Sequence, residues 1–173
     1  MKILVFSDSH NHASRIEKIL QKETNIDLII HLGDCVSDIL TMHANFPQYK
    51  YEFVPGNCDF GYDILEEKML DIEGKKVFIT HSSKYLTQNN LNKLFKSTIN
   101  IGADVVLYGH THISNKVTHN GILYLNPGCM SNARNGQQKS YMVINLNNGK
   151  LTTKIISLNE FYFSNLDKAV STM

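Results

Sequence analysis

Short runs of apolar and β-branched residues recur along the chain, and each run ends in a cluster of small or polar residues. Five of them are predicted to be strands, at residues 2–6, 28–32, 51–54, 76–80 and 104–108. Their side chains are apolar at consecutive positions, which is typical of strands that are buried on both faces of a sheet. The pattern therefore predicts a layered α/β fold.

Two other segments have the spacing of a helix. Residues 14–23 and 91–99 each carry apolar side chains three and four positions apart, and this spacing places those side chains on one helix face. The opening order is thus strand, helix, strand.

The second half of the chain changes to alternating apolar and polar residues around short turn-forming pairs. Such pairs between alternating segments are a strong hairpin signal. Hairpins are predicted at Glu73-Gly74, Asn120-Gly121 and Asn148-Gly149. Strands joined by hairpins run antiparallel, so we expect a mixed sheet or two facing sheets with helices outside, and not a parallel sheet throughout.

The composition indicates one globular domain. The chain has 173 residues, of which 42% are hydrophobic, and this is enough for a sizeable core. We expect the domain to span residues 1–157. Residues 158–173 form a polar-aromatic tail that belongs to the same domain or to an interface. Its aromatic residues Phe161, Tyr162 and Phe163 are expected to be exposed, as a docking patch or a homodimer contact.

Charge and cysteine content exclude several classes of protein. Seventeen basic and 16 acidic residues give a formal net charge of +1, so we expect no face that binds nucleic acid. No apolar run approaches the roughly 18 residues of a membrane span, so we expect no membrane partner and a cytoplasmic location. The three cysteines, Cys35, Cys58 and Cys129, are odd in number and widely spaced, which fits a reduced compartment.

A residue able to bind a metal follows each of the five predicted strands. In chain order these residues are Asp8 and His10, Asp34, Asn57, His81, and His110 with His112. In α/β folds ligands gather beyond the carboxyl ends of strands, so we expect these side chains to converge. Residues two apart on extended chain point to the same side, and Gly33 and Gly109 precede their ligands where a tight turn would help.

The type of ligand indicates the type of metal. Oxygen and imidazole ligands without thiolate suit Mn, Fe, Zn, Ni or Co. Seven ligands are too many for one ion, so a shared carboxylate is expected to bridge two.

Each signal has a plainer interpretation. A lone histidine after a strand is more often packed or on the surface, and we give that interpretation to His12, His31, His43 and His119. Gly-Asp and Gly-Asn pairs are common in turns. The metal-site hypothesis rests on the conjunction of five strand ends in order.

The motifs together resemble those of calcineurin-like metallophosphoesterases. They are DSH at 8–10, GD at 33–34, GNCD at 56–59, TH at 80–81 and GHTH at 109–112. The later segment LNPGCMSNAR resembles the compact bacterial and archaeal phosphodiesterase branch. The resemblance covers residues 1 to about 157, and it implies an α/β fold in which a two-sheet β-sandwich is flanked by helices in four αββα layers.

The resemblance also implies the roles of the residues. One divalent ion would be held by Asp8, His10, Asp34 and His112, and a second by Asp34, Asn57, His81 and His110. Two Mn ions are expected, with Ni, Fe, Zn or Co as alternatives. At a separation of about 3.5 to 4 Å they would share a hydroxide that attacks a phosphoester. The catalytic residues would be Asp34, Asn57, Cys58 and His110.

The expected activity is hydrolysis of small phosphodiesters. The alternatives are a phosphomonoesterase or a nucleotide-directed diesterase on the same centre, or a binding or scaffold module with weak catalysis. Relatives in this branch often form homodimers, so a homodimer or higher homo-oligomer is expected.

The chain departs from the wider family at three places. Cys58 stands where a histidine is common, although cysteine is common in the compact branch. Ser82 and Ser83 replace a glycine and a second histidine, and Asn11 with His12 replace a frequent glycine. A cysteine nucleophile needs a lowered pKa, so we expect Cys58 to lie beside the ions as a hydrogen-bond donor or a packed side chain.

Two further residues are candidates for substrate binding. Arg134, in a loop rich in Gly and Asn, can grip a phosphate or be an ordinary solvated arginine. His12 can line the mouth of the site or occupy the start of a helix at the surface.

Overall fold

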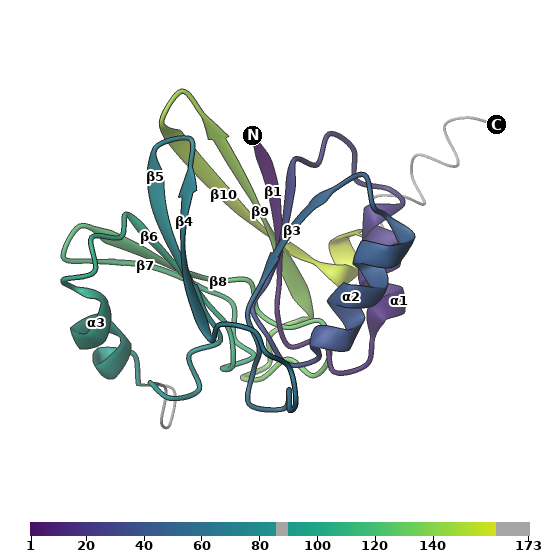
Figure 1. The fold of residues 1–173 in the computed structure, drawn as a ribbon, viewed down its shortest axis with the longest axis horizontal. Coiled ribbons are helices and arrows are strands. Elements are labelled where there is room, and N and C mark those ends of the chain that lie inside the picture. Colours follow the sequence, from purple (N-terminus) through teal and green to yellow (C-terminus); the bar gives the residue numbers. More distant parts are fainter. Residues whose placement is uncertain (86–89, 162–173) are drawn as a thin grey trace.

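Two five-stranded sheets face one another in the computed structural model of the chain, which describes residues 1–85 and 90–161 (Figure 1). The first sheet has the order β10 (Lys150–Ser157), β9 (Ser140–Asn147), β1 (Lys2–Phe6), β2 (Leu28–His31), β3 (Lys50–Phe53). The second has the order β4 (Glu67–Ile72), β5 (Lys75–Thr80), β6 (Val105–Tyr108), β8 (Ile122–Asn126), β7 (Asn115–His119).

Helices cover the outer faces of both sheets. Helices α1 (Ala13–Leu20) and α2 (Val36–Asn45) lie outside the first sheet, and α3 (Asn92–Thr98) lies outside the second (Figure 1). The predicted two-sheet sandwich with four αββα layers is therefore confirmed. Helix α2 was not predicted, because no side chain adjacent in sequence caps its start.

Strand β1 shows why its residues are apolar at consecutive positions. Ile3 and Val5 belong to the core between the two sheets, whereas Leu4 and Phe6 pack against the cluster beneath α1 and α2. Because successive side chains point to opposite faces, a strand with sheet on one side and helix on the other must be apolar throughout.

The second sheet is covered on its outer face in the same way. Leu94 of α3 is fully buried and packs with Val106, Tyr108 and Tyr124. Phe95 lies edge-on to Tyr124, with ring centroids 4.6 Å apart. The short predicted helix is thus held by its apolar face.

The three predicted hairpins are confirmed. They join β4 to β5, β7 to β8 and β9 to β10, and both residues of each turn pair have positive φ, from 48° at Glu73 to 79° at Gly121. Two central residues with positive φ match the twist of antiparallel strands.

Parallel strands within each sheet bring their carboxyl ends to one rim. Strands β1, β2 and β3 are mutually parallel in the first sheet, and β5, β6 and β8 are parallel in the second. The loops that follow these strands gather at the lower edge of the molecule in Figure 1, where the two sheets approach each other. Residues from both sheets therefore meet there.

The expectation that Phe161 is exposed was wrong. Its side chain is only 6% exposed, and its ring packs edge-on to Tyr141 with centroids 6.2 Å apart. Leu158 is buried in the same cluster, so the chain continues the core beyond β10. Tyr162 and Phe163 lie outside the described residues. No helix in the described ranges is long and apolar enough to cross a membrane.

Candidate metal centre

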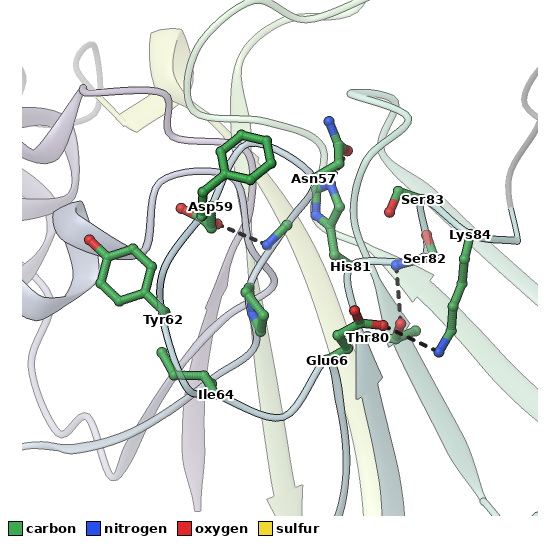
Figure 2. A pocket seen from close by; sticks show the side chains of 13 residues that line it. Asn57, Asp59, Tyr62, Ile64, Glu66, Thr80, His81, Ser82, Ser83 and Lys84 are labelled. Atoms are coloured by element: carbon green, nitrogen blue, oxygen red, sulfur yellow. Dashed lines mark hydrogen bonds and ion pairs between the residues drawn. The ribbon is translucent and has the colours of Figure 1, made fainter.

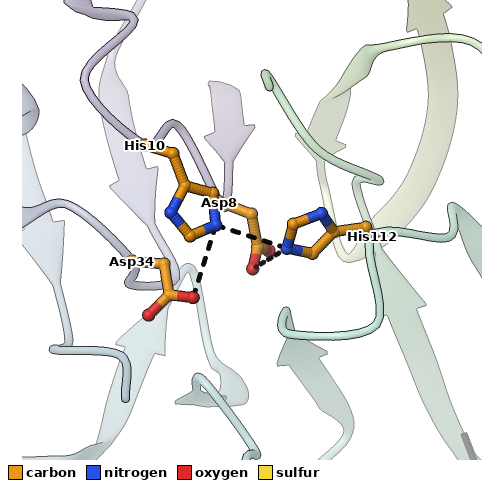
Figure 3. A group of neighbouring side chains, drawn as sticks. All are labelled: Asp8, His10, Asp34 and His112. Carbon is orange, nitrogen blue, oxygen red and sulfur yellow. Dashed lines mark hydrogen bonds and ion pairs between the residues drawn. The ribbon is translucent and has the colours of Figure 1, made fainter. Parts of the chain in front are cut away.

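Four of the predicted ligands form one group. Each of Asp8, His10, Asp34 and His112 offers a ligand atom within 4.8 Å of the others (Figure 3). They come from the loops after β1, β2 and β6, so both sheets contribute. Figure 3 shows their side chains pointing toward a common centre.

A second group contains the remaining predicted ligands. The ligand atoms of Asp34, His81 and His110 also lie within 4.8 Å of one another. Asn57 joins this group, because its Oδ1 is 3.1 Å from Nε2 of His81. All seven residues predicted from the sequence are thus together at one rim.

Asp34 belongs to both groups through a single oxygen. Its Oδ2 is 3.5 Å from Nε2 of His10 in the first group and 3.5 Å from Nε2 of His81 in the second. Its other oxygen, Oδ1, accepts a hydrogen bond of 2.9 Å from the backbone N–H of Cys58. The carboxylate is therefore fixed with one oxygen between two sets of ligands.

Backbone carbonyls orient two of the imidazoles. Nδ1 of His81 donates to the carbonyl of Leu32 at 2.7 Å, and Nδ1 of His112 donates to the carbonyl of Asn132 at 2.8 Å. A histidine that donates from one ring nitrogen presents the other as a ligand, which is the usual arrangement around a bound metal.

The ligand atoms of the first group are poorly satisfied by hydrogen bonds to one another, and a bound cation would satisfy them. Oδ1 of Asp8 is fully buried and lies 3.1 Å from Nε2 of His112, but among the described residues it receives no hydrogen bond of good geometry. Nε2 of His10 faces Nε2 of His112 at 3.4 Å. Buried polar atoms normally have a partner, and a divalent ion would satisfy these atoms together.

The carboxylates and imidazoles perturb one another's pKa values. Although burial opposes ionisation of Asp34, its hydrogen bond with His81 and the charge of that imidazole hold its pKa far below the ordinary value. The adjacent carboxylate of Asp8 raises the pKa of His112 to about 10. Strongly perturbed groups in one cluster are typical of a functional site.

Backbone strain is concentrated at the same residues. Five of the seven ligands have positive φ, a conformation that is uncommon outside glycine; they are Asp8, His10, Asp34, His110 and His112. Strained backbone persists where the surrounding structure enforces it, and it clusters at functional sites.

Glycines allow the ligand loops to pack against each other. A Cβ at Gly56 would lie 2.2 Å from Oδ1 of Asp34, and one at Gly109 would lie 2.1 Å from Oγ of Ser7. Gly33 has φ of +93°, as expected for a tight turn. Gly109 begins a tight turn, in which its carbonyl accepts a hydrogen bond of 2.8 Å from the N–H of Thr111, and a side chain at this position would collide with Ser7.

Comparisons with known proteins identify the family to which a chain with these ligand groups belongs. The family model of the calcineurin-like phosphoesterase superfamily domain matches residues 1–149. A Bacillus subtilis protein described as a probable metallophosphoesterase is 32% identical over 155 residues, which is 89% of each chain. The chain belongs to the calcineurin-like phosphoesterase superfamily.

Other relatives place this phosphoesterase in the compact bacterial and archaeal branch. A Methanocaldococcus jannaschii phosphodiesterase is 33% identical over 146 residues, covering 74% of this chain and 83% of the relative. The crystal structure of a conserved uncharacterized Streptococcus pneumoniae protein has a TM-score of 0.77 at 24% identity and covers 90% of this chain and 88% of the other. The likeness to the Streptococcus pneumoniae structure shows that the two chains share a fold. The chain is thus a member of a hydrolase family.

Cys58 of this phosphoesterase is exposed and lies beside the ligands. Burial and the charge of Asp34 raise the pKa of its thiol. A nucleophilic cysteine needs the opposite shift, and the position after Asn57 places the thiol next to the ligand groups. That Cys58 is not the nucleophile stays a prediction, and the direction of this pKa shift favours it.

The two predicted substrate-binding residues have different surroundings. Arg134 is exposed, and its backbone N–H donates to the carbonyl of His112 at 3.2 Å, so its loop lies beside a ligand loop. His12 is the N-cap residue of α1, and its Nδ1 lies 2.8 Å from the carbonyl of His10. This is the helix-terminal position that the alternative interpretation described.

Asp59 is a supporting residue that was not predicted. Its carboxylate accepts hydrogen bonds from the backbone N–H groups of Cys35, Val36 and Gly56, at 3.0, 2.7 and 2.8 Å. It thereby ties the Asn57 loop to the start of α2 and to the Asp34 loop. An aspartate that caps a helix from a distant loop leaves no local signal, since capping is recognised by residues adjacent in sequence.

The remaining histidines include His31, which is fully buried behind the ligand loops. Its Nδ1 accepts the N–H of Gly33 at 3.2 Å, so its Nε2 donates to Oγ of Ser9 at 3.1 Å. His43 and His119 pack against Tyr51 and Phe95. These contacts support the packed interpretation.

Acid is expected to destabilise the fold through His31. Burial lowers the pKa of His31 to about 4 from 6.5, so the unfolded chain binds the proton more tightly. The stability that neutral His31 contributes to the fold is fully present above about pH 6.5 and is lost as the pH falls toward 4. Between pH 7 and pH 5 the loss is about 2 kcal/mol.

Urea unfolding of the metal-free protein at both pH values measures this loss. The His31→Gln variant serves as the reference, because the metal ligands titrate equally in both proteins. Between pH 7 and pH 5 the unfolding free energy of the wild type should fall by about 2 kcal/mol more than that of the variant. Equal losses would show that His31 does not cause the acid sensitivity.

Proposed function

We propose that the protein is a metal-dependent phosphodiesterase that hydrolyses small phosphodiesters at a centre of two divalent ions, with Mn as the expected metal. The observation that carries the proposal is the position of Oδ2 of Asp34 between the two ligand groups. Asp8, His10 and His112 complete one ion's ligands, and Asn57, His81 and His110 complete the other's.

The ions would activate water as the nucleophile and neutralise the charge on the phosphoryl oxygens. The residues of the chain orient the reacting groups. Asp34 holds its Oδ2 in place through the hydrogen bond from Cys58 to Oδ1. Arg134, whose backbone contacts the ligand His112, is suited to hold a phosphoryl oxygen, since a guanidinium binds phosphate through two parallel N–H groups.

Cys58 has a supporting role in this proposal. Its backbone N–H is hydrogen-bonded to Asp34 and its side chain is exposed beside the ligand groups, so the thiol can donate a weak hydrogen bond to the leaving oxygen. The residue is therefore assigned to the leaving group and not to attack on phosphorus.

The scaffold alternative has less support. A module that has lost turnover need not keep its ligands, and here all seven predicted ligands are grouped at one rim. A phosphomonoesterase on the same centre remains the second candidate, because two ions can serve both reactions. The cytoplasmic location and the homodimer stay predictions.

The direct test is hydrolysis of bis(4-nitrophenyl) phosphate. The purified protein with added Mn²⁺ should release 4-nitrophenol, and the rate should fall by at least about 10³-fold after metal is removed with a chelator, because the ions supply several kcal/mol of transition-state stabilisation. Readdition of Mn²⁺ should restore the rate.

Two controls make this test specific. Anomalous scattering from crystals grown with Mn²⁺ should give two peaks that share Asp34. Activity that survives chelation unchanged would contradict the proposal, and faster release from 4-nitrophenyl phosphate than from the diester would favour the monoesterase.

A further inference from the structure

The loop from residue 54 to residue 66 exposes large apolar side chains next to the ligands. Phe60 is 84% exposed, Leu65 is 70% exposed and Tyr62 is 40% exposed. Phe60 follows Asn57 by only three residues. An exposed aromatic ring on a ligand-bearing loop indicates a surface that a bound molecule covers.

Two cavities adjoin this loop. The first, which we name the Ser83 cavity, has a volume of about 390 Å³ and is bordered by Asn57, His81, Ser83, Glu66 and Lys84 (Figure 2). The second, the Cys58 cavity, has a volume of about 340 Å³ and is bordered by His10, Asn11, Cys35, Ser37 and Cys58. Both volumes are within the range of small-molecule sites.

Phe60 and Tyr62 border both cavities, so they form a common wall between them. The Ser83 cavity includes His81 and Asn57 from the second ligand group, whereas the Cys58 cavity includes His10 from the first. Each ligand group therefore has its own adjoining cavity. A phosphodiester has two organic arms, and a monoester has one.

The charges in the cavities restrict what these arms can be. Nζ of Lys84 is 3.2 Å from Oε1 of Glu67 and 3.6 Å from Oε2 of Glu66. Its charge is already balanced by two carboxylates, and Figure 2 shows the ion pair with Glu66 at the edge of the cavity. Among the described residues that border the Cys58 cavity there is no lysine or arginine.

We propose that the substrate is a phosphodiester with two uncharged arms, of which an aromatic arm lies in the Ser83 cavity against Phe60 and Tyr62, and the other lies in the Cys58 cavity. This inference rests on the proposed function and specifies its substrate class. Stacking on the aromatic wall selects a planar group, and the balanced charge of Lys84 disfavours a second phosphate.

Diesters that differ in one arm test the aromatic wall. Bis(4-nitrophenyl) phosphate has two aromatic arms, and methyl 4-nitrophenyl phosphate has one. Phe60→Ala should lower kcat/KM for the first diester about tenfold, mainly through KM, because an aromatic contact is made equally in the ground and transition states. In both diesters the leaving 4-nitrophenolate lies in the Cys58 cavity, beside the thiol assigned to the leaving oxygen. The Ser83 cavity then holds the second nitrophenyl group of the first diester but only the methyl group of the other, so kcat/KM for the methyl diester should fall by less than about threefold.

Matched variants separate this effect from damage to the fold. Leu65→Ala removes another exposed apolar side chain of the same loop, one that borders neither cavity, and should change the hydrolysis of neither substrate. Phe60→Tyr should keep the wild-type preference. Equal losses on both diesters in Phe60→Ala, or the same loss in Leu65→Ala, would overturn the inference. If the wild type with Mn²⁺ hydrolyses no diester, the proposed function itself fails.

A second pair of substrates tests the charge. Thymidine 5′-(4-nitrophenyl phosphate) and its 3′-phosphorylated form differ only in one phosphate. The 3′-phosphorylated form should have a kcat/KM lower by at least about tenfold, because unmatched like charges are costly in a binding site. Equal or faster hydrolysis would show that the cavities accept a charged arm and would overturn that part of the inference.

Discussion

Replacement of Asp34 by asparagine is expected to abolish most of the activity and the binding of both metal ions. The change keeps the shape of the side chain but removes the charge of Oδ2, which lies 3.5 Å from ligand nitrogens of both groups. The rate on bis(4-nitrophenyl) phosphate should fall by about 10³-fold or more, since loss of several kcal/mol of metal stabilisation corresponds to that factor.

Metal content decides whether this loss has the proposed cause. The wild type should bind two equivalents of Mn²⁺ by elemental analysis, and Asp34→Asn fewer than one. Asp38→Asn is the matched control, because Asp38 is also buried and its Oδ2 accepts a bond from the backbone N–H of His12, which an asparagine can still accept. This control should keep both ions. If Asp34→Asn retained two ions and a near wild-type rate, the shared-ligand role would be refuted.

Gly33→Ala is expected to give the largest loss of stability. The new Cβ would lie 2.6 Å from the backbone nitrogen of Gly56 and 2.8 Å from the carbonyl carbon of Pro55. Neither atom is the end of a flexible side chain, so the loop that carries Asn57 must move. With the left-handed backbone of Gly33, the expected loss in unfolding free energy is about 3 kcal/mol or more.

Gly102→Ala separates the clash from the backbone effect. Gly102 also has positive φ, at +73°, but a Cβ there would have no neighbour within 4 Å. Its variant should lose only about 1 to 2 kcal/mol. Urea unfolding of both metal-free variants measures the difference, and losses within about 0.5 kcal/mol of each other would mean that the contact with Gly56 does not constrain the fold.

Local patterns predicted most of the secondary structure. The strand residues alternate between the sheet core and the helix-covered face, so they had to be apolar throughout, and the turn pairs such as Asn120-Gly121 have the positive φ that only a few residues accept. These features depend on neighbours in sequence. Helix α2 was missed because its start is supported by Asp59, 23 residues after Val36.

Exposure of Phe161 was predicted incorrectly for a similar reason. A Leu-Asn-Glu-Phe segment after a strand can lie on the surface or in the core, and its own sequence does not distinguish the two. Phe161 is buried because Tyr141 of β9 and the cluster beneath α1 provide an apolar surface at that place.

The sequence by itself determined which residues can bind metal and that they follow strand ends, because the types of side chain and their spacing are local properties. Only the tertiary structure decided that two sheets bring these ends to one rim, that Oδ2 of Asp34 lies between both groups, and that Phe60 stands between two cavities. These arrangements involve residues that are far apart in the chain, and the packing of the two sheets sets the distances between them.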